Sequence, residues 1–152
     1  MPDTFATTVR EAMHTGCTCI PEGETVLEAA RMMERLDVGA LPICGEDDRL
    51  RGIVTDRDIV VKVLGRNRDP RTTFAGELAQ DRLIHIRADA PIDEALRLMG
   101  THKVRRLPVI DDEKRLCGMI SEADVATHVP AEAFAEMLAS IASAQPHHFS
   151  VR

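Results

Sequence analysis

The 152-residue chain is 44% hydrophobic and has a formal net charge of −6 at pH 7, values that suit one compact domain or two small halves sharing a core. The negative charge and the absence of Trp and Tyr argue against a general nucleic-acid binder, because such proteins use basic surfaces and aromatic stacking. No apolar run approaches the roughly 20 residues that cross a bilayer, and no signal-peptide pattern opens the chain, so we expect a cytoplasmic protein that does not contact membranes.

The first half of the chain predicts a strand, a helix, two strands and a second helix. The short β-type run "TCI" at 18–20 precedes Thr25 and Glu28, which have the spacing of a capping box and open a segment with apolar residues at helical intervals. The strands "ALPIC" and "LRGIVT" flank the acidic turn "GEDD", and the helical segment "DRDIVVKVL" follows. Residues 64–72 are a polar linker that contains a proline.

The same order of elements returns at an offset of 66 residues (118 − 52 = 66), where "GIVTDRD" at Gly52 is matched by "GMISEAD" at Gly118. The run "IHI" at 84–86 corresponds to "TCI", Pro91 suits the first turn of the next helix, and the strands "RLPVI" and "LCGMIS" lead to the helical segment "EADVATHV". We therefore predict an α+β fold with two β-α-β-β-α repeats, at residues 9–63 and 73–129.

A separate helix is predicted at the C-terminal end, at residues 130–145. Its apolar side chains recur on one helical face, at Phe134, Met137, Leu138 and Ile141. Such a stripe indicates either a helix that covers the core or a dimer contact.

The repeated segments resemble the CBS domain: each has a strand containing Leu-Pro, followed by Gly, two apolar residues, Thr or Ser, and an Asp three positions later. Over residues 9–129 the two together resemble a tandem CBS pair, or Bateman module. This resemblance implies pseudo-twofold symmetry between the halves and a flat homodimer. It also implies a stand-alone regulatory module that binds an adenosyl nucleotide such as AMP, ATP or S-adenosylmethionine between the repeats, needs no obligatory cofactor, and signals to a protein partner that the sequence does not identify.

Within that resemblance, the two motifs supply the residues that would bind the nucleotide. Asp58 and Asp124 present carboxylates that match a ribose diol, and Thr55 and Ser121, at strand ends before helices, can donate to a phosphate. The apolar strand residues that adenine would contact include Ile20, Leu41, Pro42, Ile86, Leu107 and Pro108. The alternative is structural: Thr55 and Ser121 act as helix N-caps and the aspartates support the first helical turn, and both roles can coexist.

Basic residues distinguish the two repeats. Arg105 and Arg106 precede the second-repeat strand beside Lys103, whereas the first repeat has no charged residue at the positions equivalent to the arginines and instead places Arg57 inside its motif. Guanidinium groups suit phosphate, so we expect Arg105 and Arg106 to make the second repeat the better nucleotide site. The alternative is a solvated edge or salt bridges to the "GEDD" turn.

Two cysteines of the first half suggest a different function. Cys19 lies in the first strand and Cys44 ends the second, and a β-α-β crossover places such strands side by side. The thiols can pair as a disulfide or remain reduced, the state usual in the cytosol. The alternative function is accordingly a nucleotide-free scaffold that responds to stress or redox conditions through a Cys19–Cys44 disulfide.

Neither a metal site nor catalysis is predicted. His14, Cys17 and Cys19 lack a fourth ligand at a familiar spacing, and Cys117 is interpreted as a core thiol. A nucleophile elbow, a Walker loop, a glycine-rich dinucleotide turn and an HExxH helix are all missing from the sequence. We therefore expect a binding protein and not an enzyme.

Overall fold

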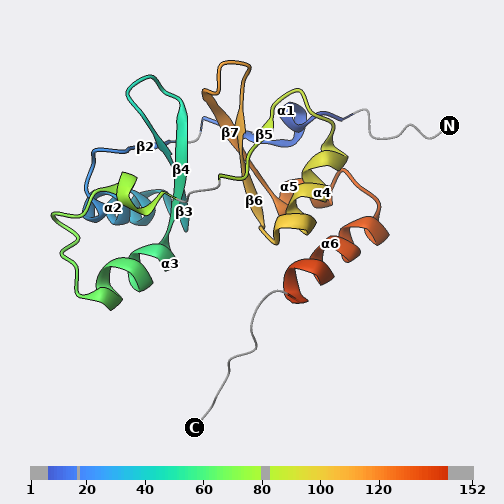
Figure 1. Ribbon diagram of the computed structural model, residues 1–152. Helices are drawn as coiled ribbons and strands as arrows, with labels where there is room; N and C mark the ends of the chain where they lie inside the picture. Colours follow the sequence, from blue (N-terminus) through green and yellow to red (C-terminus); the bar gives the residue numbers. More distant parts are fainter. Residues whose placement is uncertain (1–6, 17, 80–82, 144–152) are drawn as a thin grey trace, which may run out of the picture. The chain divides into compact units, whose positions relative to one another are not determined.

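The computed structural model describes residues 7–16, 18–79 and 83–143, and Figure 1 shows its helices and strands. The chain divides into two compact units. Unit 1 contains the described residues of Met1–Thr15, Ile84–Asp111 and Cys117–Arg152, and unit 2 contains those of Gly16–Leu83 and Asp112–Leu116. Each unit thus combines most of one repeat with the first residues of the other.

Unit 2 contains a three-stranded sheet in the order β2-β3-β4. Strand β2 (Ile20–Pro21) is parallel to β3 (Ala40–Cys44), which is antiparallel to β4 (Leu50–Thr55). Helix α2 (Val26–Leu36) connects β2 to β3, and its first turn is capped by Thr25. The short helical segments of this unit are α3 (Asp56–Asp58), the π-helix η1 (Ile59–Val63), and the 3₁₀ turns η2 (Leu64–Arg66) and η3 (Ala75–Leu78).

Unit 1 contains a sheet in the order β1-β7-β6-β5. Its strands are β1 (His14–Thr15), β5 (Ile86–Arg87), β6 (Arg106–Ile110) and β7 (Leu116–Ser121). Its helices are α1 (Val9–Ala12), α4 (Ile92–His102), α5 (Glu122–Ala126) and α6 (Ala131–Ser143). Strand β5 is parallel to β6, and β1 is antiparallel to β7.

Each unit has its own hydrophobic core. In unit 2 the core joins α2 to the sheet through residues such as Val26, Ile43 and Val54. In unit 1, α6 packs on α4 and buries Met137 and Ile141, which confirms for the described residues that the C-terminal stripe covers a core. Burial of apolar side chains is the dominant stabilising contribution in both units.

The glycine of each repeated motif permits a close approach by another segment of the same unit. A Cβ atom on Gly118 would overlap the carbonyl oxygen of His14, because β1 lies directly against β7. In unit 2, a Cβ atom on Gly52 would lie 2.7 Å from Cβ of Ala79. Position 79 is equivalent to position 13 at the repeat offset (79 − 13 = 66), and Sδ of Met13 would lie 3.2 Å from the Cβ atom on Gly118, so equivalent residues approach the two motif glycines.

The predicted α+β fold with two repeats is confirmed, and the differences are local. The first strand of each repeat is shorter than expected and lies later, at Ile20–Pro21 and Ile86–Arg87. Pro91 is the N-cap of α4 and not part of its first turn. The helix expected over 56–64 is interrupted by the π-helix η1, whose sequence "IVVKV" is rich in β-branched residues that fit a regular helix poorly.

Candidate functional site

In the second repeat, the repeated hydroxyl and carboxylate form a capping box at the junction of β7 and α5. The amide of Ser121 donates to Oδ2 of Asp124 at 2.9 Å, and the amide of Asp124 donates to the hydroxyl of Ser121 at 3.3 Å. That hydroxyl also lies 3.0 Å from Oδ2. The N-cap interpretation is therefore confirmed for this repeat.

The first repeat has the same arrangement where β4 meets α3. The amide of Thr55 donates to Oδ2 of Asp58, and the amide of Asp58 donates back to the Thr55 hydroxyl, both at 3.0 Å. The other carboxylate oxygen, Oδ1, is 3.2 Å from the ammonium of Lys62, one helical turn further along the chain. A lysine of the same short helical region thus neutralises this aspartate.

The corresponding carboxylate of the second repeat has a different partner, which the sequence analysis did not assign to it. Nδ1 of His14, on β1, lies 3.1 Å from Oδ1 and 3.1 Å from Oδ2 of Asp124. The His14 side chain is 77% exposed, whereas that of Asp124 is 10% exposed. His14 therefore lies at the solvent side of a carboxylate that the protein otherwise largely encloses.

Two of the three arginines predicted to bind phosphate belong to the unit that contains this capping box, and they differ in their partners. Nη1 of Arg105 is 2.9 and 3.1 Å from the two carboxylate oxygens of Glu122, in the first turn of α5. Arg106 is exposed at the start of β6. Arg57 is exposed in α3 of the other unit. Of the three, Arg105 is held by an acidic residue of its own unit, and Arg106 extends the positive charge at the same strand end.

Two of the apolar residues predicted to contact adenine lie in the sheet of unit 1. Ile86 is buried in β5, and Pro108 is buried in β6, the strand next to β5. Ile86 also lines a cavity of about 320 Å³ with His85, Arg87, Asp89, Ala90 and Glu94. This cavity offers a mixed apolar and charged lining at the end of β5.

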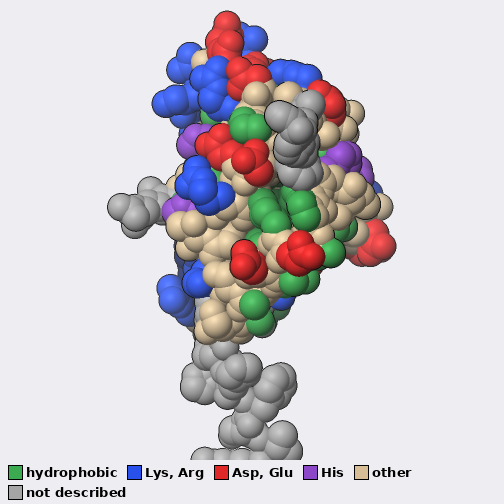
Figure 2. Space-filling view, turned by 90° about the vertical axis from the view of Figure 1, so that its right-hand side faces the viewer, with side chains coloured by type: hydrophobic (Ala, Val, Ile, Leu, Met, Phe, Trp, Pro, Cys, Tyr) green, Lys and Arg blue, Asp and Glu red, His purple; other side chains and the backbone are tan. Residues whose placement is uncertain are grey.

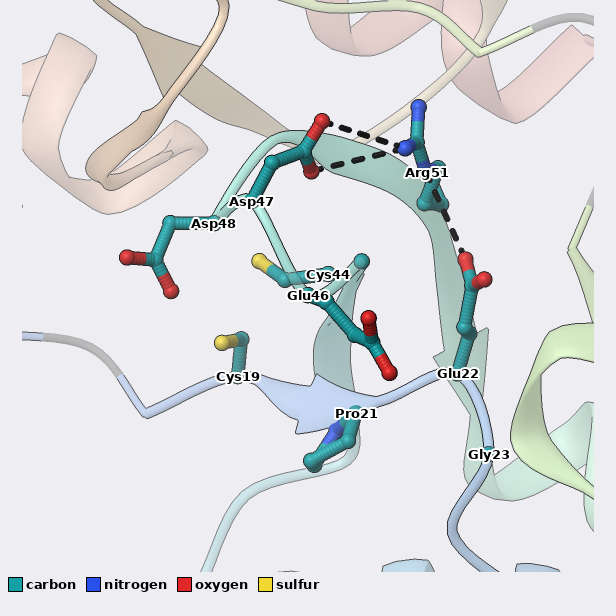
Figure 3. Close-up of a pocket in the computed structure, with 10 residues that line it drawn as sticks. Cys19, Pro21, Glu22, Gly23, Cys44, Glu46, Asp47, Asp48 and Arg51 are labelled. Atoms are coloured by element: carbon teal, nitrogen blue, oxygen red, sulfur yellow. Dashed lines mark hydrogen bonds and ion pairs between the residues drawn. The ribbon is translucent and has the colours of Figure 1, made fainter.

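Cys19 and Cys44 line a single larger pocket in unit 2, with a volume of about 780 Å³ (Figure 3). The structure holds both as thiols, so the Cys19–Cys44 disulfide is not formed in it. In the strand register, Cys44 is opposite Pro21, so Cys19 lies diagonally from Cys44 and not directly opposite it. The two sulfur atoms nevertheless lie at the same side of the pocket in Figure 3.

The rest of this pocket is strongly acidic. Nη2 of Arg51 is 3.3 Å from Oδ2 of Asp47, and Nε of Arg51 is 3.4 Å from Oε2 of Glu22 (Figure 3). The backbone N–H of Arg49 lowers the pKa of the Asp47 carboxyl, and the positive charge of Arg51 lowers it further. The rim thus carries ionised carboxylates around one guanidinium.

Cys117 lies half-buried in β7. Burial raises the pKa of its thiol, and the negative charge of Asp111 raises it further. A raised pKa keeps the thiol protonated and unreactive near neutral pH. This agrees with its interpretation as a core residue.

Neither a metal-holding cluster nor a membrane-spanning helix occurs in the part of the chain that the structure describes. There, no three His, Cys, Asp or Glu side chains come together in a way that could hold a metal ion. Cys17 lies outside the described residues. None of the described helices has both the length and the apolar character needed to cross a membrane.

Comparison with known proteins agrees with this geometry. The CBS domain model matches residues 9–65 and 75–131. Hypoxic response protein 1 of Mycobacterium tuberculosis is 50% identical over 137 residues, which cover 90% of this chain and 95% of that protein.

Two solved structures are similar over most of the chain. The crystal structure of hypoxic response protein I, which has two coordinated zinc ions, matches with a TM-score of 0.75 and 52% identity, covering 81% of this chain and 99% of that one. The CBS domain pair of protein MJ0100, in complex with 5′-methylthioadenosine and S-adenosyl-L-methionine, matches with a TM-score of 0.70 and 26% identity, covering 80% and 94% respectively.

Proposed function

The chain belongs to the CBS-domain family, and we propose that it is a regulatory module that binds an adenosyl nucleotide at the second-repeat capping box and signals to a protein partner. The observation that carries this proposal is that one unit contains the Asp124 carboxylate in the first turn of α5, Arg105 paired with Glu122 of that same turn, and the exposed Arg106 at the start of β6. The adenosyl compounds bound by the MJ0100 CBS pair support the ligand class.

The capping box determines which oxygen the ribose would use. Oδ2 of Asp124 already accepts the amide of Ser121, so Oδ1 is the oxygen better placed to accept a ribose hydroxyl. The Ser121 hydroxyl is engaged by Asp124 as well, so it would contact a phosphate only by exchanging that bond. Ribose recognition therefore rests mainly on one carboxylate oxygen.

The guanidinium groups would provide the phosphate contact. Arg106 is exposed at the start of β6, whereas Arg105 would have to share or release Glu122. In the first repeat, Lys62 neutralises Asp58, and Arg57 is the basic residue of the motif. We therefore assign the stronger site to the second repeat and a weaker one to the first.

The proposed ligand is small, and the proposed action is binding without catalysis. On the face of the molecule shown in Figure 2, acidic and basic side chains are interspersed, which suits local contact with one small anion better than contact with a nucleic-acid backbone. The zinc ions belong to the structure of hypoxic response protein I and are not part of this proposal.

We also propose a homodimer as the working form. Large apolar side chains that remain exposed in the described residues all lie in unit 2: Leu36, Val38, Val60, Val61, Leu64 and Phe74. Val60 and Leu64 are four residues apart in one helical region, so they share a face. Pairing with a second chain would remove such a face from water.

A second candidate function is supported by the thiol pocket. Cys19 and Cys44 line one cavity, Cys19 directly before β2 and Cys44 at the end of the parallel strand β3, so an oxidant reaching the pocket could convert them to a disulfide. In that case the protein would act as a stress- or redox-responsive scaffold without nucleotide.

Calorimetric titration of the reduced protein with AMP, ATP and S-adenosylmethionine tests the first function. Binding of one of these compounds that depends on Asp124 would support the regulatory module. Absence of binding at millimolar concentration would favour the scaffold.

A further inference from the structure

Strand β1 is a short strap that lies over the proposed ligand site of unit 1. It has two residues, His14 and Thr15, which pair with Met119 and Gly118 of β7. Both residues of β1 are exposed, so little buried apolar surface holds the strap in place. Gly16 follows at once with a φ of +72°, a left-handed conformation in which glycine is favoured.

The imidazole of His14 occupies the part of Asp124 that a ribose would need. Oδ2 already accepts the amide of Ser121 and lies 3.0 Å from its hydroxyl, which leaves Oδ1 as the oxygen outside the capping box. Nδ1 of His14 is 3.1 Å from that oxygen and also 3.1 Å from Oδ2, the oxygen with which it forms a hydrogen bond. An imidazole that carries hydrogen on Nδ1 can donate to this carboxylate whether its ring is charged or neutral.

We propose that His14 competes with the ligand for Asp124, so that nucleotide binding displaces β1 from this site. The proposal rests on the function proposed above and names its regulation. Because the imidazole lies against both carboxylate oxygens, a ribose hydroxyl can reach Oδ1 only when His14 moves away. This movement costs little free energy, because the His14 side chain is exposed and β1 pairs through only two residues.

Among the described residues, the carboxylate of the first repeat has a different kind of partner. Its cation, Lys62, is four residues from Asp58 in the same helical region, so the two remain neighbours whatever the rest of the chain does. In the second repeat, the partner of the carboxylate, His14, comes from a segment 110 residues away in sequence. This contact can be broken by moving a separate strand.

Displacement of β1 would also affect the junction between the two units. Thr15 is the last residue of the first segment of unit 1, and Gly16 is the first residue of unit 2. A ligand that releases β1 therefore alters the segment through which the chain passes from one unit to the other. This links occupancy of Asp124 to a change that a partner protein can detect.

The test compares ligand affinity in the full-length wild type, in His14→Ala, and in His102→Ala, which removes another exposed imidazole of unit 1 at the end of α4. AMP, ATP and S-adenosylmethionine are titrated separately by calorimetry. His14→Ala should bind the active compound about two- to fivefold more tightly, the range expected for losing one exposed competing ion pair. His102→Ala should match the wild type.

Equal or weaker binding by His14→Ala would overturn the competition while leaving the nucleotide function intact. Absence of binding in all three proteins would end the nucleotide function and the competition with it. A second readout concerns the protein without ligand: the ring NMR signals of His14 should shift in Asp124→Asn, since that substitution removes the charge that His14 contacts. Unchanged ring signals would show that the contact does not exist in solution and would also overturn the competition.

Discussion

Gly118 lies so close to β1 that a Cβ atom at this position would overlap the carbonyl oxygen of His14. Gly118→Ala must therefore push β1 away from β7, and overpacking of this kind costs about 1–3 kcal/mol of unfolding free energy. For a chain of this size, we expect the melting temperature to fall by about 2–4 °C for each kcal/mol lost.

Gly23→Ala is the matched control for this substitution. A Cβ atom on Gly23 meets nothing within 4 Å, and its backbone is not in the left-handed region. Its unfolding free energy should stay within about 0.5 kcal/mol of the wild type. Thermal unfolding measures both variants. Equal losses of unfolding free energy would show that glycine is not required at position 118 by the close approach of β1.

Arg106→Ala should weaken the binding of AMP and ATP more than that of adenosine, because only the nucleotides present a phosphate. A hydrogen bond to a charged group contributes about 1.5–3 kcal/mol, so we expect a loss of about ten- to a hundredfold for AMP by calorimetry. Arg97→Ala, which removes an exposed guanidinium on α4, is the control and should bind like the wild type. An equal loss for adenosine and AMP would assign Arg106 a structural role instead.

The thiol pocket predicts a crosslink under oxidising conditions. Mass spectrometry of oxidised, unreduced protein should find a peptide that joins Cys19 to Cys44, and Cys44→Ser should lower the melting temperature only when oxidant is present. Cys117→Ser is the control, because burial raises the pKa of that thiol and slows its reaction. Complete alkylation of Cys19 and Cys44 after oxidant treatment would remove the redox function.

The proposed dimer predicts a mass in solution of about twice that of the chain at tens of micromolar, measured by light scattering. Leu64→Glu places a charge in the exposed apolar helical region of unit 2 and should shift the protein toward the monomer. Arg66→Glu, two residues further along the chain, changes charge without removing an apolar side chain and is the control. A wild-type mass equal to one chain would contradict the dimer.

The fold was predictable because the repeat constrains it. Matching positions at one offset identified both hairpins and both connecting helices, and Thr25 marked the start of α2 correctly. The limits of the short strands were harder to predict, because Ile20–Pro21 and Ile86–Arg87 offer too few residues for an alternating pattern. The π-helix at 59–63 depends on how a β-branched run packs, which periodicity does not reveal.

The candidate site was predictable in its motif but not in its partners. Ser121 and Asp124 have the spacing of a capping box, and the structure forms one. Lys62 could have been paired with Asp58 from its spacing of four residues on a helix. The contact between His14 and Asp124 had no such signal, because it depends on a two-residue strand pairing with a strand more than a hundred residues later.

The most direct test of the nucleotide function compares Asp124→Ala with Asp58→Ala in calorimetric titrations with AMP, ATP and S-adenosylmethionine. Each substitution removes the carboxylate that accepts the N-cap amide of its own repeat, so the losses of helix capping are matched. We predict that Asp124→Ala weakens binding about ten- to a hundredfold, the loss expected for a hydrogen bond to a charged group, and that Asp58→Ala weakens it less. Unchanged binding in Asp124→Ala together with loss of binding in Asp58→Ala would contradict the assignment of the site to the second repeat. Failure of every compound to bind the wild type at millimolar concentration would contradict the nucleotide function itself.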